Sequence, residues 1–410
     1  MTQSDSHKSK LVVVLVAALG YFVDIYDLIL FGIVKNPSLI DIGVTTSEGL
    51  FNKGNFLLSI QMAGMLIGGI VWGILGDKKG RLSTLFMTIL IYSLANIANG
   101  MVQTIEQYAV LRFISGFGLA GELGVGITLV SEVMSKERRG IAGALVSGIG
   151  IVGSVLAFVV AEKFNWRIAY YTGGALGLLL LVMRIAVFES GMFERTKEAD
   201  VRRGDFLSLF THKKRLGKFL FCILLAIPTW YTVSVLTINA PSFAQESLHI
   251  TGTIKGSTSV MMHYIGAAIG SLLFGYLSMK LQSRKKAIFI AIVMMALFTA
   301  VYFALFNAAP WMFYTTLLIL GIPMGGLWAV FVTTASELFG TNLRATVTTS
   351  APNFVRGATI LITVSLSAFT PVMGLWMAGV VVGVIFLSVA FASTFFIEET
   401  YNKELDYFEE

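Results

Sequence analysis

The sequence Gly73-Ile-Leu-Gly-Asp-Lys-Lys-Gly-Arg81 lies between two long apolar runs. It places one acid, three bases and three glycines in a segment too short to form a domain. The glycines allow close backbone approach and a tight turn. Asp77 can accept hydrogen bonds from the N-terminal amides of a neighbouring helix or pair with a base. The segment therefore predicts a polar turn between two membrane helices.

The composition around this turn predicts a membrane protein. The chain has 410 residues, of which 56% are hydrophobic and 13% charged, and its mean hydropathy is +0.79. Soluble domains carry about 25% charged residues. A hydrocarbon core about 30 Å thick needs about 20 apolar residues per helix, and its backbone groups must be bonded internally. Twelve helices are expected, at 11–34, 54–76, 82–102, 107–134, 140–161, 167–189, 216–240, 254–280, 287–307, 310–338, 345–370 and 371–397. Little sequence remains for a soluble domain.

Several other classes of protein are excluded by the composition. The single cysteine, Cys222, excludes an intramolecular disulfide. The four histidines are too scattered to predict a metal site, and no cofactor-binding or phosphate-binding motif and no Ser/His/Asp set is present. The first apolar segment is too long and too acidic for a cleaved signal peptide. The net charge of +6 and the pI of 9.2 reflect basic loops rather than a nucleic-acid partner.

The distribution of basic residues predicts the orientation. With the N-terminus inside, 22 of the 30 Lys and Arg residues fall in inner loops, and five (Lys35, Lys53, Lys163, Arg167 and Lys255) fall in outer loops. Cytoplasmic loops carry such an excess of Lys and Arg. Both termini are therefore expected in the cytoplasm.

An internal repeat predicts two halves. Ser131-Glu132 is followed by Arg139, and Ser336-Glu337 is followed by Arg344, at the same spacing and 205 residues apart. A second copy of the first loop stands at Gly275–Arg284, with Met279 in place of the acid. The expected organisation is an N-terminal six-helix bundle at 1–189, a cytoplasmic linker at 190–215 and a C-terminal six-helix bundle at 216–410.

Charges inside the apolar segments are candidates for function, because a charge at mid-bilayer costs at least about 2.5–3.5 kcal/mol. Asp24 and Asp27 share a face of the first helix by their spacing. Burial disfavours a charged carboxylate and a second carboxylate disfavours it further, as a proton-coupling group requires. The alternative is an acid that stays paired with an arginine. Arg112 is the expected partner of Asp27, and Glu122 is either a second titrating group or an interhelical contact.

A second set of polar residues lies in the C-terminal half. Arg356 has no acid close in sequence, and its guanidinium suits a carboxylate or a phosphate. We expect it either to bind an anionic substrate or to pair with an acid of the first or fourth helix. Other candidates for the substrate-binding cavity are Asn353, His263, Trp230, Tyr231, Trp328 and Asn239. The alternative for the histidine and the aromatics is packing within the helices.

These stretches together resemble the major facilitator superfamily, and within it the metabolite–proton and sialate/lactate–proton symporters. The resemblance covers the whole chain and rests on the 73–81 loop, the Asp24-x-x-Asp27 pair, the run Arg112–Glu122 and the run from Ser336 to Arg356. Gly340 departs from the family's usual proline. The resemblance implies twelve helices in two pseudo-symmetric bundles, proton coupling through the first and fourth helices, and gating on the inner face. The gating residues it implies are Asp77, Arg81, Glu132, Arg139, Glu337 and Arg344.

The resulting hypothesis is a proton-coupled symporter that imports a small organic anion by alternating access. We expect it to be a monomer in a bacterial inner membrane, with protons, substrate and the lipid bilayer as partners. The run Gly143–Gly153 lacks the proline typical of drug–proton antiporters, which disfavours drug export. The alternatives are a facilitator or an exporter of a related metabolite or carboxylate siderophore. A membrane enzyme or sensor has no supporting motif.

Overall fold

The computed structural model describes residues 3–79, 81–122, 136–189, 206 and 208–403. Within these ranges, the side chains of 3–14, 76–79, 81–82, 136–145, 147, 186–189, 208, 341–342 and 345 are not described. The part of the chain that the structure describes is helical and contains no strand.

The first half of the chain forms long helices. They are α1 (Gln3–Asp41), α2 (Ser47–Lys79), α3 (Arg81–Asn99), α4 (Ile105–Leu119), α6 (Lys136–Lys163) and α7 (Trp166–Glu189). Thr104 caps α4 by accepting from the Gln107 amide at 3.3 Å. The sequence predicted Asp77 in a loop after the second helix. Because α2 continues to Lys79, Asp77 lies instead in the last turn of α2.

The second half contains α8 (Ser208–Thr211), α9 (Lys213–Tyr231), α10 (Ala240–Ser242), α11 (Gly256–Lys280), α12 (Arg284–Phe303), α13 (Pro310–Leu338) and α14 (Thr341–Phe396). Two π-helical segments, η1 (Thr232–Thr237) and η2 (Phe243–Ser247), flank α10. The expected single helix at 216–240 is therefore interrupted. Such non-α backbone is tolerated at membrane depth only where protein or a cavity covers it, and η1 is buried throughout.

Eight helices within the described residues are long and apolar enough to cross a membrane, and α3 adds a shorter apolar helix. One of the eight, Thr346–Phe396, contains the last two expected spans. It is divided at Gly374, whose φ of 78° and ψ of 159° are not helical. The expected break at Thr370-Pro371 was wrong by a few residues, because a positive φ is accessible to glycine and not to proline.

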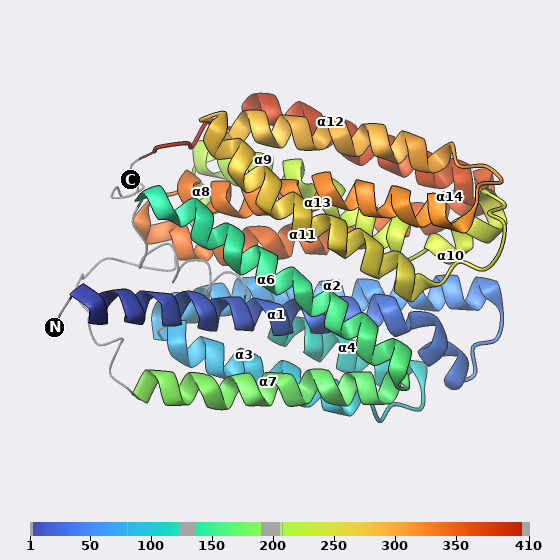
Figure 1. Ribbon diagram of the computed structural model, residues 1–410, viewed down its shortest axis with the longest axis horizontal. Helices are drawn as coiled ribbons and strands as arrows, with labels where there is room; N and C mark the ends of the chain where they lie inside the picture. The colour runs from blue at the N-terminus through green and yellow to red at the C-terminus, as the bar shows by residue number, and fades with distance from the viewer. Residues whose placement is uncertain (1–2, 80, 123–135, 190–205, 207, 404–410) are drawn as a thin grey trace.

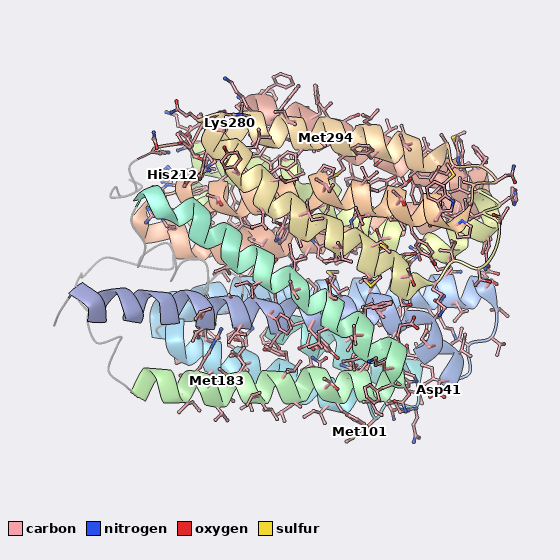
Figure 2. The ribbon with its side chains drawn as sticks, viewed as in Figure 1. Asp41, Met101, Met183, His212, Lys280 and Met294 are labelled. Atoms are coloured by element: carbon pink, nitrogen blue, oxygen red, sulfur yellow. The ribbon has the colours of Figure 1, made fainter. Side chains whose placement is uncertain are left out.

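Helices close to one another in sequence gather into two groups (Figure 1). In this view α1, α3, α4 and α7 lie in the lower part and α9, α12, α13 and α14 in the upper part. Between the groups, α2 packs against α14 and α6 packs against α11. The ends of the described chain lie at the same end of the molecule. Figure 2 places His212 and Lys280 at that end, and Asp41 and Met101 at the opposite end, the Asp41 end.

Glycines set the closest helix contact, between α11 and α13. A Cβ at Gly266 or Gly270 would lie 1.9 Å or 1.8 Å from a backbone oxygen of α13, and one at Gly321 or Gly325 would lie 2.0 Å from an oxygen of α11. Small residues four apart let membrane helices approach in this way. This packing fixes how α13 presents Trp328 to the centre of the molecule.

Candidate functional site

A narrow cavity lies between the two groups of helices. Its lining comes from both groups: Tyr21, Ile25 and Leu28 of α1, Ile151 of α6, Thr229, Trp230 and Val233 of α9 and η1, Tyr264 and Ala267 of α11, Met324, Gly325 and Trp328 of α13, and Arg356 of α14. The volume of this cavity is about 30 Å³. That is room for one or two water molecules. The cavity is therefore nearly closed, and a metabolite requires the helices to move apart.

Arg356 is the charged residue of this lining, and its side chain is fully buried. Its Nη2 lies 3.5 Å from Asp24 Oδ2, and its Nη1 donates to Asn353 Oδ1 at 3.3 Å. The guanidinium carbon also lies 5.5 Å from the ring centroid of Trp328, whose indole N–H donates to Tyr21. A cation over an aromatic face and beside a carboxylate is held in place and can still donate further hydrogen bonds, since the Nε of Arg356 has no partner among the described side chains and backbone.

The two acids of α1 have different surroundings, although both are fully buried. Asp24 reaches Arg356 with one oxygen, and its Oδ1 has no hydrogen-bond partner in the part of the chain that the structure describes. Neither oxygen of Asp27 has a partner within hydrogen-bond geometry among the described residues, and Asn96 is a polar side chain near it. A buried carboxylate without donors costs several kcal/mol as an anion and much less once it holds a proton. The two acids are thus placed where a proton can be taken up inside the helices.

Arg112 does not form the ion pair that the sequence predicted. Its guanidinium donates to Gln61 through a very short contact and to the Tyr170 hydroxyl at 3.4 Å. Its guanidinium carbon lies 4.8 Å from the ring centroid of Phe31. The predicted direct ion pair of Asp27 with Arg112 is therefore absent, although the charge of Arg112 still acts on Asp27. The contacts of the arginine within the described residues are neutral acceptors and an aromatic ring.

Glu122 is an interhelical contact. Both of its oxygens accept from Arg184 of α7, one of them at 3.0 Å, and both side chains are 2% exposed. The sequence analysis gave Arg184 no role. Its position in the apolar run 167–189 was a sufficient signal that an acid of another helix must pair with it.

The remaining predicted substrate residues lie at different depths. Asn353 donates to the backbone oxygens of Ala120 and Thr349, and so holds Arg356 from behind. Three others lie outside the cavity lining: Tyr231 bonds Gly379, His263 bonds Leu317, and Asn239 bonds Asn55 and Ser234. Trp230, itself a candidate from the sequence, and Tyr264, next to the predicted His263, line the cavity in their place. Helical periodicity could not choose between such neighbours.

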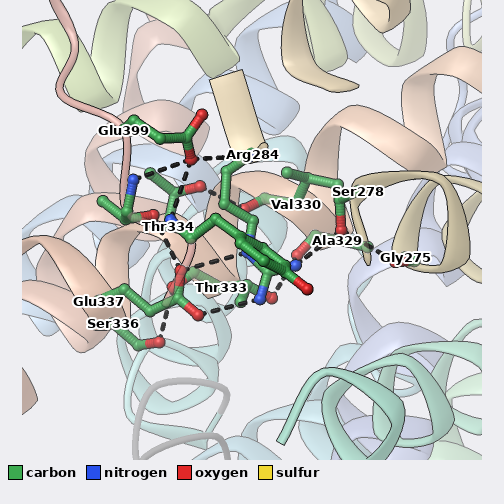
Figure 3. Close-up of polar contacts among 12 residues, drawn as sticks. Gly275, Ser278, Arg284, Ala329, Val330, Thr333, Thr334, Ser336, Glu337 and Glu399 are labelled. Atoms are coloured by element: carbon green, nitrogen blue, oxygen red, sulfur yellow. Dashed lines mark hydrogen bonds and ion pairs between the residues drawn. The ribbon is translucent and has the colours of Figure 1, made fainter. Parts of the chain in front are cut away.

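A polar cluster closes the end of the molecule that holds Lys280 (Figure 3). Arg284 donates to both oxygens of Glu337 at 3.2 and 3.0 Å. Glu399 accepts from the Ser283 hydroxyl and, at 2.9 Å, from the backbone amide of Arg284. Burial raises the pKa of Glu399, but hydrogen bonds from Ser283 and from backbone amides outweigh it and lower the pKa below its usual range.

Of the predicted gating residues, Glu337 and Arg344 have described side chains. Glu337 has Arg284 as a partner, a base that the sequence analysis did not select. Arg344 is 8% exposed. Glu132 and the side chains of Asp77, Arg81 and Arg139 lie outside the described residues.

Comparisons with known proteins agree on one family. The profile of the Major Facilitator Superfamily matches residues 17–363. A probable 4-methylmuconolactone transporter of Cupriavidus pinatubonensis is 26% identical over 80% of this chain and 76% of its own length. A cis,cis-muconate transport protein of Acinetobacter baylyi is 29% identical over 84% of each chain. In three dimensions the fold is similar to the proton:xylose symporter XylE, with a TM-score of 0.75, 16% identity and 98% of each chain covered.

Proposed function

The chain belongs to the Major Facilitator Superfamily and is a membrane transporter, and we propose that it imports a small organic anion together with protons by alternating access. The observation that carries this proposal is Arg356. It is a fully buried cation in the wall of the cavity between the two helix groups, beside a carboxylate at 3.5 Å. A guanidinium in such a place suits the carboxylate of a substrate. The relatives named for muconate and methylmuconolactone support an organic acid as cargo.

Proton and anion are coupled through Asp24 in this proposal. While Asp24 is charged, it competes with an incoming carboxylate for Arg356. A proton on Asp24 removes that competitor, so the anion binds Arg356 most tightly when Asp24 is neutral. Asp27 lies one turn away on α1, has no donor in hydrogen-bond geometry among the described residues, and is the second proton site. Trp328 and Asn353 keep the guanidinium aimed at the cavity in either state.

The direction of import follows from the proposed orientation. Both ends of the described chain lie at the end that holds Lys280, where the excess of basic residues predicts the cytoplasm. We place the protein as a monomer in a bacterial inner membrane, with the Asp41 end outside. The cluster of Arg284, Glu337 and Glu399 then belongs to the inner gate, together with the predicted residues of the 73–81 loop.

Uptake by proteoliposomes tests the proposal. Purified protein is reconstituted and offered cis,cis-muconate, 4-methylmuconolactone and, as a neutral comparison, xylose, with and without an inwardly directed proton gradient. We expect an organic anion to accumulate only with the gradient. Asp27→Asn should abolish accumulation and spare exchange, and Asp24→Asn should do the same. Arg356→Gln should weaken anion binding about 10- to 150-fold, the cost of one charged hydrogen-bonding group.

One variant serves as a control, and three outcomes would contradict the proposal. Asp41→Asn changes an acid at the exposed end of the same helix α1 and should leave accumulation unchanged. Unchanged gradient-driven uptake in both Asp24→Asn and Asp27→Asn would contradict proton coupling through α1. A facilitator would equilibrate the anion without accumulating it. An exporter would move the anion out of loaded vesicles in exchange for protons that enter along their gradient.

A further inference from the structure

Lys35 is a buried lysine near the Asp41 end of α1, and the transport mechanism above does not use it. Its side chain is 4% exposed. The ammonium donates to Asn239 Oδ1 at 2.8 Å and to the Ile238 backbone oxygen at 3.4 Å. No carboxylate of the described residues lies within 4.0 Å of it. The sequence analysis placed Lys35 in an outer loop, whereas the structure places it inside α1 with neutral acceptors alone.

The position of Lys35 is directly above the cavity. Leu28, Gly32 and Lys35 follow one another on one face of α1, because three- and four-residue steps return to the same side of a helix. Leu28 lines the cavity, and a Cβ at Gly32 would lie 3.1 Å from the side chain of Ile238. Along this face α1 thus meets the second helix group from the cavity up to Lys35. A solute that entered along this face from the Asp41 end would pass the lysine.

The acceptors of Lys35 belong to an interrupted helix. Ile238 and Asn239 stand between η1 and α10, and Asn239 also donates to Asn55 of α2 at 3.2 Å. Lys35 and Asn55 come from the first helix group, and Ile238 and Asn239 from the second. Opening the Asp41 end therefore separates the ammonium from both acceptors. The π-helical turns beside them supply backbone that can move without breaking a regular helix.

We propose that Lys35 is the docking cation of the outer vestibule, unmasked when the Asp41 end opens and the first contact for the incoming anion. This inference rests on the proposed function, since only an anionic substrate gains from such a cation. Once exposed to water and freed from Asn239, the ammonium lacks a fixed negative partner, so a carboxylate on its way to Arg356 is attracted to it. When the end closes again, Asn239 and Ile238 take the ammonium back and the anion is passed inward.

Charged thiol reagents test this proposal without any knowledge of the substrate. Cys222, the single and buried cysteine, is replaced by Ala, and Leu28→Cys is introduced as a reporter two turns below Lys35. Intact cells are treated with anionic sulfonatoethyl or cationic trimethylammonioethyl methanethiosulfonate. The rate with the anionic reagent is divided by the rate with the cationic reagent. This ratio is compared between the protein that keeps Lys35 and Lys35→Gln. At low ionic strength, one charge across about 10 Å of water changes each rate about twofold in opposite directions, so the anionic-to-cationic ratio should fall about fourfold.

Two controls keep the result independent of folding. Lys35→Arg retains the charge and should retain the ratio, whereas Lys255→Gln removes an exposed base at the same end and should leave it unchanged. In the protein that keeps Lys35, about 1 M salt should reduce the ratio to the level of Lys35→Gln, which needs no further variant. An equal ratio with Lys35 and Lys35→Gln, no salt dependence, or no reaction from outside would each overturn the proposal. Because no substrate is used, these outcomes are distinct from a failure of the uptake experiment.

Discussion

Replacing Arg184 with Gln leaves the Glu122 carboxylate without its counter-ion at a position that is 2% exposed. At 3.0 Å and an effective dielectric constant of about 20, the attraction between the two charges is about 5 kcal/mol. Removing one partner of a buried pair costs about 3–5 kcal/mol, because the remaining charge stays buried. For a helix group of about 200 residues, each kcal/mol shifts Tm by about 2–4 °C. We therefore expect the melting temperature of Arg184→Gln to fall by about 6–20 °C.

The assay is the thermal unfolding of purified protein in detergent, followed by tryptophan fluorescence. The double variant Glu122→Gln with Arg184→Gln places two neutral amides at the contact and should regain most of the lost stability. Asp41→Asn is the matched control, because it breaks an ion pair of the same length between α1 and α7 at an exposed position. That exposed pair should be worth less than about 1 kcal/mol.

The outcome also decides the role of Glu122. If the glutamate only positions helices, the double variant keeps its proton-driven accumulation in proteoliposomes. If Glu122 titrates during transport, the double variant is stable but no longer accumulates the anion. Equal melting temperatures for Arg184→Gln and Asp41→Asn would refute the reasoning that burial sets the strength of this pair.

Two further predictions concern packing and the inner face. Gly270→Ala should lower the free energy of unfolding by about 1–3 kcal/mol, because its Cβ would lie 1.8 Å from the Ile322 oxygen. Gly217→Ala, with open space around it, should be neutral or stabilising. Equal melting temperatures of the two variants would contradict the close α11–α13 contact. Glu399→Gln should cost about 1 kcal/mol at neutral pH, the value of a helix cap. Because the pKa of Glu399 is lowered on folding, its contribution is present above the usual carboxylate pKa and is lost as pH falls through the folded value. Unfolding from pH 7 to pH 3 should therefore show the two proteins converging in acid, and a difference that grows in acid would be the contrary result.

The membrane class and the family were readable from local sequence. Apolar runs of helical length, the 73–81 turn and the basic inner loops predicted a helical membrane transporter, and the match over residues 17–363 confirms the superfamily. Asp24 and Arg356 also stood out as charges inside apolar runs, and the structure brings them together across 332 positions of sequence. Their selection needed only the cost of a charge in hydrocarbon, which is a property of each residue and its segment.

The partners of the charged side chains could not be read from the local sequence. Asp27 and Arg112 were natural partners by type, yet the arginine bonds Gln61 and Tyr170. Arg184 was left without a role until its contact with Glu122, 62 positions away, was seen. Lys35 was assigned to a loop and is buried against Asn239. In each case the missing information was which faces of two helices meet.

The sequence by itself determined that this chain crosses a membrane as helices. It also predicted which end of the molecule faces the cytoplasm and which charges inside apolar runs are candidates for function. These follow from the price of polar groups in hydrocarbon, and that price is set residue by residue. Only the tertiary structure decided the partners of those charges, the residues that line the cavity and the break at Gly374. Those depend on the rotation and approach of helices, which glycine contacts such as Gly270 with Ile322 establish between segments far apart in the chain.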